Sequence, residues 1–128
     1  WAGEIPGRIG GAMVADRSGT STGFALDNLQ LRGELFIGIG EDVYEGMIIG
    51  ESSRPDAMVV NPARTKELTN IRTHAHDEAV RLAPPRRVTL ETGIEWIADD
   101  ELVEVTPSAI RLRKRHLSES DRRLARKR

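Results

Sequence analysis

The apolar residues of this chain occur in short runs, and each run is closed after a few positions by glycine, proline or a polar turn. Such runs are typical of strands, because a strand needs roughly four to eight residues and a globular helix about ten or more. The first two runs are expected to form a hairpin through a turn at 16–19. The strands we predict lie at 10–15, 20–29, 33–39, 46–50, 57–61 and 78–82.

One internal helix is predicted at 90–98. Thr89 precedes it as a candidate N-cap, and an acidic residue in the first turn suits the helix dipole. Leu90, Ile94 and Ile97 recur at i, i+4 and i+7, so we expect these three to form the apolar stripe that packs against the sheet.

A second hairpin is predicted over 101–113, because two alternating runs flank a Pro-Ser turn. Alternation along its second strand turns Ile110 and Leu112 inward. The outward positions carry positive charge, so one face of the hairpin is expected to form a basic ribbon. The residues of this ribbon are Arg111, Arg113 and Arg115.

Strands outnumber helices in these predictions, which favours an α+β, mainly β fold. We expect antiparallel strands and hairpins to form a compact sheet or partial barrel with one packed helix. The 128 residues suit one domain at 10–115. Residues 1–9 are expected to be a linker from a preceding domain, since the chain opens with Trp1 rather than Met. Residues 116–128 are expected to be a basic tail with a possible short helix.

Composition excludes several classes of protein. The chain has no cysteine, so disulfides and thiolate zinc sites are excluded, and a reducing compartment such as the cytoplasm is expected. No window approaches the ~18 consecutive apolar residues of a membrane helix. No membrane partner is therefore expected.

Charge is unevenly distributed, although the net charge is only −1. Residues 1–58 carry four basic and nine acidic side chains, whereas residues 59–87 carry six and three. Residues 88–109 carry six acidic side chains and no basic one, and residues 110–128 carry nine basic and two acidic. Clustered arginine and lysine are typical of surfaces that neutralise phosphates. The alternative for the last segment is an ordinary solvated tail.

Catalytic motifs are weak in this sequence. Gly38 and Gly40 begin like a dinucleotide loop, but the third glycine is absent, so a bend in a β fold is the better interpretation. No Gly-x-x-x-x-Gly-Lys-Ser/Thr loop is present. His74 and His76 could present two imidazoles to a metal, yet only one further histidine exists. The acidic residues at 99–104 are expected to be a solvated helix end or partners for arginines.

Several strings in the sequence resemble the C-terminal domain of the BipA/TypA translational GTPases. The two main stretches are residues 43–50 (VYEGMIIG) and residues 101–107 (ELVEVTP) followed by 110–115 (IRLRKR). Supporting strings lie at 68–72, 77–79 and 84–90. The likeness runs in order from about residue 10 to residue 123.

This resemblance implies a parent protein that binds the ribosome. GTP and Mg²⁺ would then be held by upstream domains of the same chain, and this fragment would be no enzyme and would hold no cofactor. The family is associated with large-subunit assembly and stress adaptation. Its C-terminal domain reaches toward large-subunit rRNA and the acceptor end of the A-site tRNA. The loop at 61–76 would approach that tRNA, although Thr65 and Glu67 stand where the family pattern leads us to expect a glycine and a second lysine.

We therefore predict a monomeric RNA-binding module that uses a long basic loop and a basic strand face. Phosphate contacts of this kind position a protein on structured RNA without reading its sequence. The alternatives are a protein-docking module, which the acidic first half favours, and a small metal-dependent hydrolase built on His74 and His76. The predicted RNA-binding residues are Asn61, Arg64, Lys66, Thr69, Asn70, Arg72, His74, Arg86, Arg87, Arg111, Arg113, Lys114 and Arg115.

Overall fold

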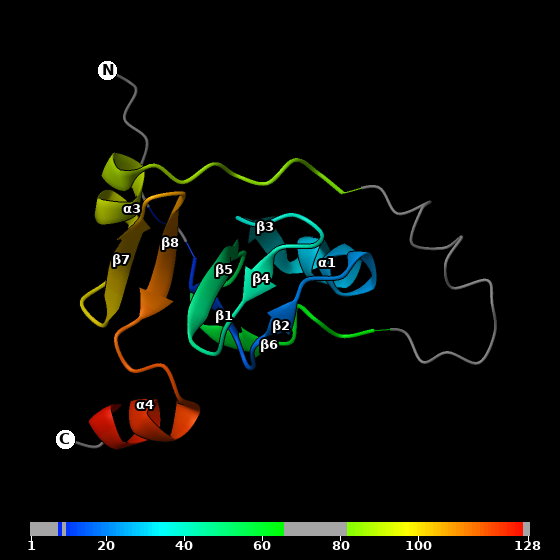
Figure 1. The fold of residues 1–128 in the computed structure, drawn as a ribbon. Coiled ribbons are helices and arrows are strands. Elements are labelled where there is room, and N and C mark those ends of the chain that lie inside the picture. The colour runs from blue at the N-terminus through cyan, green and yellow to red at the C-terminus, as the bar shows by residue number, and fades with distance from the viewer. Residues whose placement is uncertain (1–7, 9, 66–81, 127–128) are drawn as a thin grey trace.

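The computed structural model describes residue 8 and the ranges 10–65 and 82–126. Within these ranges the chain folds as an open sheet with helices packed around it (Figure 1). The α+β, mainly β class predicted from the sequence is confirmed. Among the described residues the strands do not close into a barrel.

The main sheet has the order β6-β1-β5-β8-β7, with β3 (Gly33–Leu35) also pairing with β5. β1 (Ala12–Ala15) is buried along its whole length. It runs antiparallel to β5 (Met47–Ser52) and parallel to β6 (Met58–Val60). β6 is the edge strand on this side of the sheet. The strands predicted at 46–50 and 57–61 are therefore confirmed, the first as the central β5 and the second as the edge strand β6.

The predicted hairpin between the first two runs is wrong. β2 (Gly19–Thr20) pairs with β4 (Asp42–Val43) and not with β1. Residues after β2 form helix α1 (Gly23–Leu29) and the 3₁₀ turn η1 (Gln30–Arg32).

Helix α1 forms where a strand was predicted because its apolar residues have helical spacing. Thr22 is its N-cap, and the Thr22 side chain accepts a hydrogen bond from the N–H of Ala25 at 3.1 Å. Ala25, Leu26 and Leu29 are buried on one side of the helix. The prediction of a single packed helix is therefore corrected.

Two hydrophobic clusters lie on the sheet, on its α1 side and on its α3 side. The first gathers residues of α1, β3 and β5, including Leu26, Leu35 and Ile49. The second contains Ile48, Trp96 and Leu112. Neighbouring residues of β5 therefore serve opposite faces, as pleating requires.

Helix α3 (Leu90–Trp96) is confirmed, together with its Thr89 cap, which forms a capping box with Thr92. The predicted apolar stripe is wrong, because Leu90 and Ile94 are 43% and 56% exposed. The helix instead buries Gly93 and Trp96. A Cβ built on Gly93 would lie 3.1 Å from Leu112 Cδ2, so glycine permits this close approach.

The second hairpin is confirmed as β7 (Glu101–Thr106) and β8 (Ala109–Lys114), with Thr106 opposite Ala109 across the two-residue turn. Helix α4 (Glu119–Arg126) confirms the predicted short C-terminal helix. The N–H of Asp121 donates to the Ser118 hydroxyl at 3.1 Å. The strand predicted at 78–82 lies outside the described residues except for Leu82.

Candidate nucleic-acid interface

The predicted basic loop begins at an anchored turn after β6. The side chain of Asn61 accepts a hydrogen bond from the N–H of Ala63 at 3.0 Å. The Thr22 hydroxyl that caps α1 also donates to the carbonyl of Arg64 at 2.5 Å. The exposed Arg64 guanidinium lies 5.6 Å from the centroid of the Phe24 ring. Arg64 is therefore held over α1 with its charge open to solvent.

The chain returns from the loop beside the same elements. Leu82 packs against the first hydrophobic cluster. The N–H of Ala83 donates to the Gln30 side chain at 3.0 Å, and the N–H of Arg86 donates to the Leu35 carbonyl at 2.7 Å. The start of the loop is thus held at α1, and its return is held at η1 and β3. The predicted RNA-binding residues that lie outside the described residues are Lys66, Thr69, Asn70, Arg72 and His74.

Two strands share one edge of β5 and separate there. β8 pairs with β5 at Met47 and Ile48, whereas β3 takes the same edge at residues 50–52. Between these pairings the N–H of Phe36 donates to the Ile49 carbonyl at 2.8 Å. β8 therefore diverges from β5 after Ile48, and the sheet forks.

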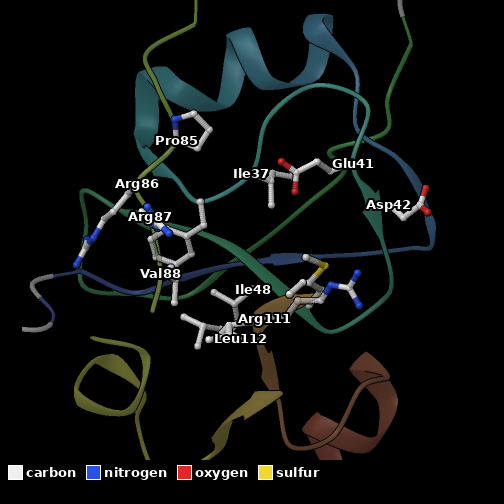
Figure 2. Close-up of a pocket in the computed structure, with 14 residues that line it drawn as sticks. Ile37, Glu41, Asp42, Ile48, Pro85, Arg86, Arg87, Val88, Arg111 and Leu112 are labelled. Atoms are coloured by element: carbon white, nitrogen blue, oxygen red, sulfur yellow. The ribbon is translucent and has the colours of Figure 1, made fainter. Parts of the chain in front are cut away.

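A groove of about 460 Å³ lies in this fork. Residues 36–37 line one wall and residues 109–112 the other, while 85–88 cross one end. Figure 2 shows Val88, Ile48 and Leu112 together at the base, with Arg86 on one side and Asp42 on the other. The charged residues that line the groove are Glu41, Asp42, Arg86, Arg87 and Arg111.

The structure divides the predicted cations into paired and unpaired ones. Arg86 and Lys114 form ion pairs with buried carboxylates. Within the described part of the chain, five other predicted cations have no carboxylate within ion-pair distance. These five unpaired arginines are Arg64, Arg87, Arg111, Arg113 and Arg115.

Lys114 belongs to a buried network under β7. Its Nζ donates to Glu101 Oε2 at 2.8 Å and to Asp100 Oδ2 at 3.0 Å, and Arg8 Nη1 contacts Glu101 Oε1 at 2.5 Å. Burial alone would raise the pKa of Glu101, but hydrogen bonds from Arg8 and Lys114 outweigh it and hold that pKa below its usual value. The acidic segment therefore partners internal cations, as the sequence suggested. Lys114 is only 7% exposed, so little of its ammonium group is open to an external phosphate.

Glu51 is a buried carboxylate that sequence reasoning missed. It accepts from the N–H of Gly10 at 2.7 Å, from Trp96 Nε1 at 2.8 Å and from Arg86 Nη1 at 2.6 Å. It thus ties the start of the domain, α3 and the segment after the loop to one point. The only signal in the sequence is a glutamate directly after the apolar run of β5.

Arg111 and Arg113 lie on the face of the hairpin opposite Lys114, as alternation predicted. Tyr44 is on this face, and its hydroxyl donates to Glu104 Oε1 at 2.5 Å. Burial and this carboxylate raise the pKa of Tyr44, while the positive charges of Arg113 and Arg111 oppose the rise.

The glycine loop at 38–41 is a bend, as the sequence indicated. The N–H of Gly38 donates to Glu41 Oε2 at 2.8 Å, and Gly40 has φ +83°. Strand β4 follows, so no helix N-terminus is present to bind a phosphate there. Among the described residues no group of three His, Asp or Glu is arranged to hold a metal ion, and His74 and His76 lie outside them. No described helix is long and apolar enough to cross a membrane.

Comparison with known proteins gives one consistent result. The model of the TypA/BipA C-terminal domain family matches residues 10–119. A protein named large ribosomal subunit assembly factor BipA is 54% identical in Escherichia coli (strain K12) and 52% identical in Salmonella typhimurium, each over 96% of this chain. The protein of the same name in Buchnera aphidicola subsp. Schizaphis graminum is 47% identical over 95% of the chain. The chain spans 20% of the length of each of these relatives.

Proposed function

Since the chain belongs to the TypA/BipA C-terminal domain family, we propose that it docks its parent protein onto RNA of the large ribosomal subunit. The observation that carries this proposal is the set of five unpaired arginines in the basic segments, where buried carboxylates hold Arg86 and Lys114. Arginine is a strong phosphate ligand because its planar fork can donate two parallel hydrogen bonds. The relatives' name, which refers to assembly of the large subunit, supports the same partner.

The proposed surface has three parts. Arg64 marks the base of the loop, Arg87 and Arg111 line the groove, and Arg113 and Arg115 lie at the end of β8. Phosphate contacts from separated points fix orientation more than sequence. We further propose that the loop itself meets the A-site tRNA.

The parent's own activity is also part of this proposal. A translational GTPase would bind GTP and Mg²⁺ in domains outside this chain, since the sequence has no phosphate-binding loop of the Gly-Lys-Ser/Thr type. GTP hydrolysis there would time the docking and release of this domain. Purified parent protein should then bind large subunits with GTP-dependent affinity.

The test is co-sedimentation of this chain with purified large subunits across a salt titration. Replacing Arg64, Arg87 and Arg115 with Glu should weaken binding and lower the slope of log K against log salt by about 2–3, at roughly 0.7–0.9 per lost phosphate contact. A matched control replaces the exposed Arg17, Arg32 and Arg54 with Glu, which changes the net charge equally. Equal losses in both triple variants would mean that overall charge, and not this surface, drives binding.

A protein-docking surface is the second candidate, and α3 gives it a specific observation. Leu90 and Ile94 lie one turn apart and are 43% and 56% exposed. Nuclease treatment of the co-sedimented complex separates the two functions, because a protein interface survives the loss of RNA. Replacing Leu90 and Ile94 with Ser would then abolish the residual binding.

A further inference from the structure

We propose that the groove in the fork between β5 and β8 takes one unstacked nucleotide of single-stranded RNA. The base would lie between residues 36–37 and β8, and a flanking phosphate would meet Arg87 or Arg111. This inference rests on the proposed function and deepens it, since it adds a base-binding site to a surface that otherwise contacts phosphates.

The size and lining of the groove suit a base. Its volume of about 460 Å³ falls within the ~300–1,000 Å³ typical of small-ligand sites. Ile48 and Leu112 form an apolar base to the groove and are each 2% exposed, with Val88 beside them (Figure 2). Proteins that read single-stranded RNA commonly stack an unstacked base on an aromatic side chain and hydrogen-bond its edge, and Phe36 also lines this groove.

The fork also presents a backbone edge to its occupant. The N–H of Lys114 donates to the Gly46 carbonyl at 2.8 Å, so Lys114 directs its backbone groups toward β5. Alternation along the strand directs those of Leu112 and Ile110 the same way. β8 no longer pairs with β5 at Ile110, so the N–H and C=O of Ile110 face the groove. One donor and one acceptor on a single residue match the polar edge of a base.

Charges of both signs line the groove. Arg87 and Arg111 line it together with Glu41 and Asp42. Glu41 uses Oε2 to accept from the N–H of Gly38, which leaves Oε1 as an acceptor. Carboxylates accept hydrogen bonds from exocyclic amino groups of bases. The groove should therefore prefer amino-bearing bases, such as adenine, over uracil.

An added peptide strand fits the same edge less well. Ordinary strands have about 5–6 residues. The free edge of β8 spans only the residues before Leu112, and the Pro-Ser turn ends it at Ser108. Single-residue backbone pairing favours a nucleotide, whose phosphate Arg87 or Arg111 can meet.

The experiment compares three tetranucleotides that carry the same number of phosphates: all-adenosine, all-uridine and abasic. Binding to this chain is measured by anisotropy at low salt, and contact is located by amide NMR shifts. We expect the adenosine form to bind about tenfold more tightly than the abasic one, a difference typical of a pair of base hydrogen bonds. The amide of Ile110 should shift with adenosine and not with the abasic form.

Variants assign the effect to the groove. Arg111→Met should weaken all three oligonucleotides. Glu41→Gln removes a negative charge, so it should strengthen all three to a similar degree and reduce the preference for adenosine over uridine. Arg54→Met, an exposed arginine outside the groove, is the control. Equal binding of adenosine and abasic forms would overturn the groove inference and leave RNA docking intact.

The remaining outcomes also test whether the groove binds a nucleotide. If no oligonucleotide binds at low salt, the groove is not a nucleotide site, and co-sedimentation with large subunits then judges the docking function separately. A base preference that persists in Glu41→Gln and Arg111→Met, without a shift at Ile110, would place the base elsewhere and overturn the inference. An extended peptide that shifts Ile110 where RNA does not would replace the nucleotide with a strand.

Discussion

Glu51 should be a costly carboxylate to remove from this domain. Its side chain is buried and accepts hydrogen bonds from Gly10, Trp96 and Arg86. Glu51→Ala would leave a main-chain N–H, an indole N–H and a guanidinium facing a small void. Loss of one partner from a buried ion pair costs about 3–5 kcal/mol, and each abandoned donor about 1–3 kcal/mol.

The Arg86 side chain is 29% exposed, so water can rehydrate part of its charge. We therefore expect a loss of about 3–5 kcal/mol in the free energy of unfolding, and not the larger sum of the separate contributions. A domain of ordinary stability, about 5–15 kcal/mol, can stay folded after that loss. Glu51→Gln keeps one carbonyl acceptor and should lose less, about 1.5–3 kcal/mol, a value typical of hydrogen bonds to charged groups.

Urea denaturation followed by tryptophan fluorescence measures these losses, with Trp96 as a reporter at the site. The matched control is Glu34→Ala, since Glu34 contacts the same Arg86 Nη1 at 3.3 Å but has a side chain that is 60% exposed. An exposed pair of this kind contributes about 0–1 kcal/mol. If Glu51→Ala loses no more than Glu34→Ala, burial does not give Glu51 the role argued here.

Two further predictions concern backbone and pH. Gly46 and Gly40 both have positive φ, but a Cβ on Gly46 would lie 2.7 Å from Leu117 Cα, whereas a Cβ on Gly40 would meet nothing within 4 Å. In urea denaturation, Gly40→Ala should therefore lower the free energy of unfolding only by the conformational cost of about 1–2 kcal/mol, and Gly46→Ala should lower it clearly more. Equal losses would contradict the overlap argument. Burial and Glu104 raise the pKa of Tyr44, so its contribution to stability is fully present below the pKa of an unfolded tyrosine, about 10, and is lost as pH rises through the folded value. Because Tyr44 is the chain's single tyrosine, its absorbance titration reports this directly, and a midpoint near 10 would refute the raised pKa.

The parts of the fold that could be predicted from the sequence are those set by local pattern. The hairpin of β7 and β8 follows from alternation around a Pro-Ser turn, and Thr89 marks the start of α3. The strand predicted at 20–29 was wrong because β2 ends after two residues, and Ala25, Leu26 and Leu29 then follow a helical period. The short window contained both patterns, and the Thr22 cap was the signal that separated them.

The prediction of the apolar stripe of α3 was wrong for a different reason. Leu90 and Ile94 have ideal spacing, yet the sheet receives Gly93 and Trp96. The helix is positioned by the Trp96 hydrogen bond to Glu51, which lies 45 positions away along the chain. It is also positioned by the close approach to Leu112 that Gly93 permits. Such long-range polar contacts carry no local period, so a pattern of apolar residues cannot reveal them.

Arg86 and Arg87 show how far sequence reasoning reaches into the site. They are adjacent and chemically identical, and both were predicted to bind RNA. In the structure Arg86 forms an ion pair with the buried Glu51, whereas Arg87 is exposed at the groove. The same division separates Lys114, paired with Glu101, from Arg113 on the opposite face of β8.

The same alternation, extended by one residue, places Lys114 on the inward face with Ile110 and Leu112, so its inclusion among RNA ligands followed its charge and ignored its register. Basic residues in this domain thus divide by which carboxylates the fold buries beside them. Glu51 and Glu101 each hold one predicted cation, which leaves the five unpaired arginines for the proposed phosphate contacts. A count of charge along the sequence locates the basic segments, but only the positions of these two buried glutamates select the residues within them.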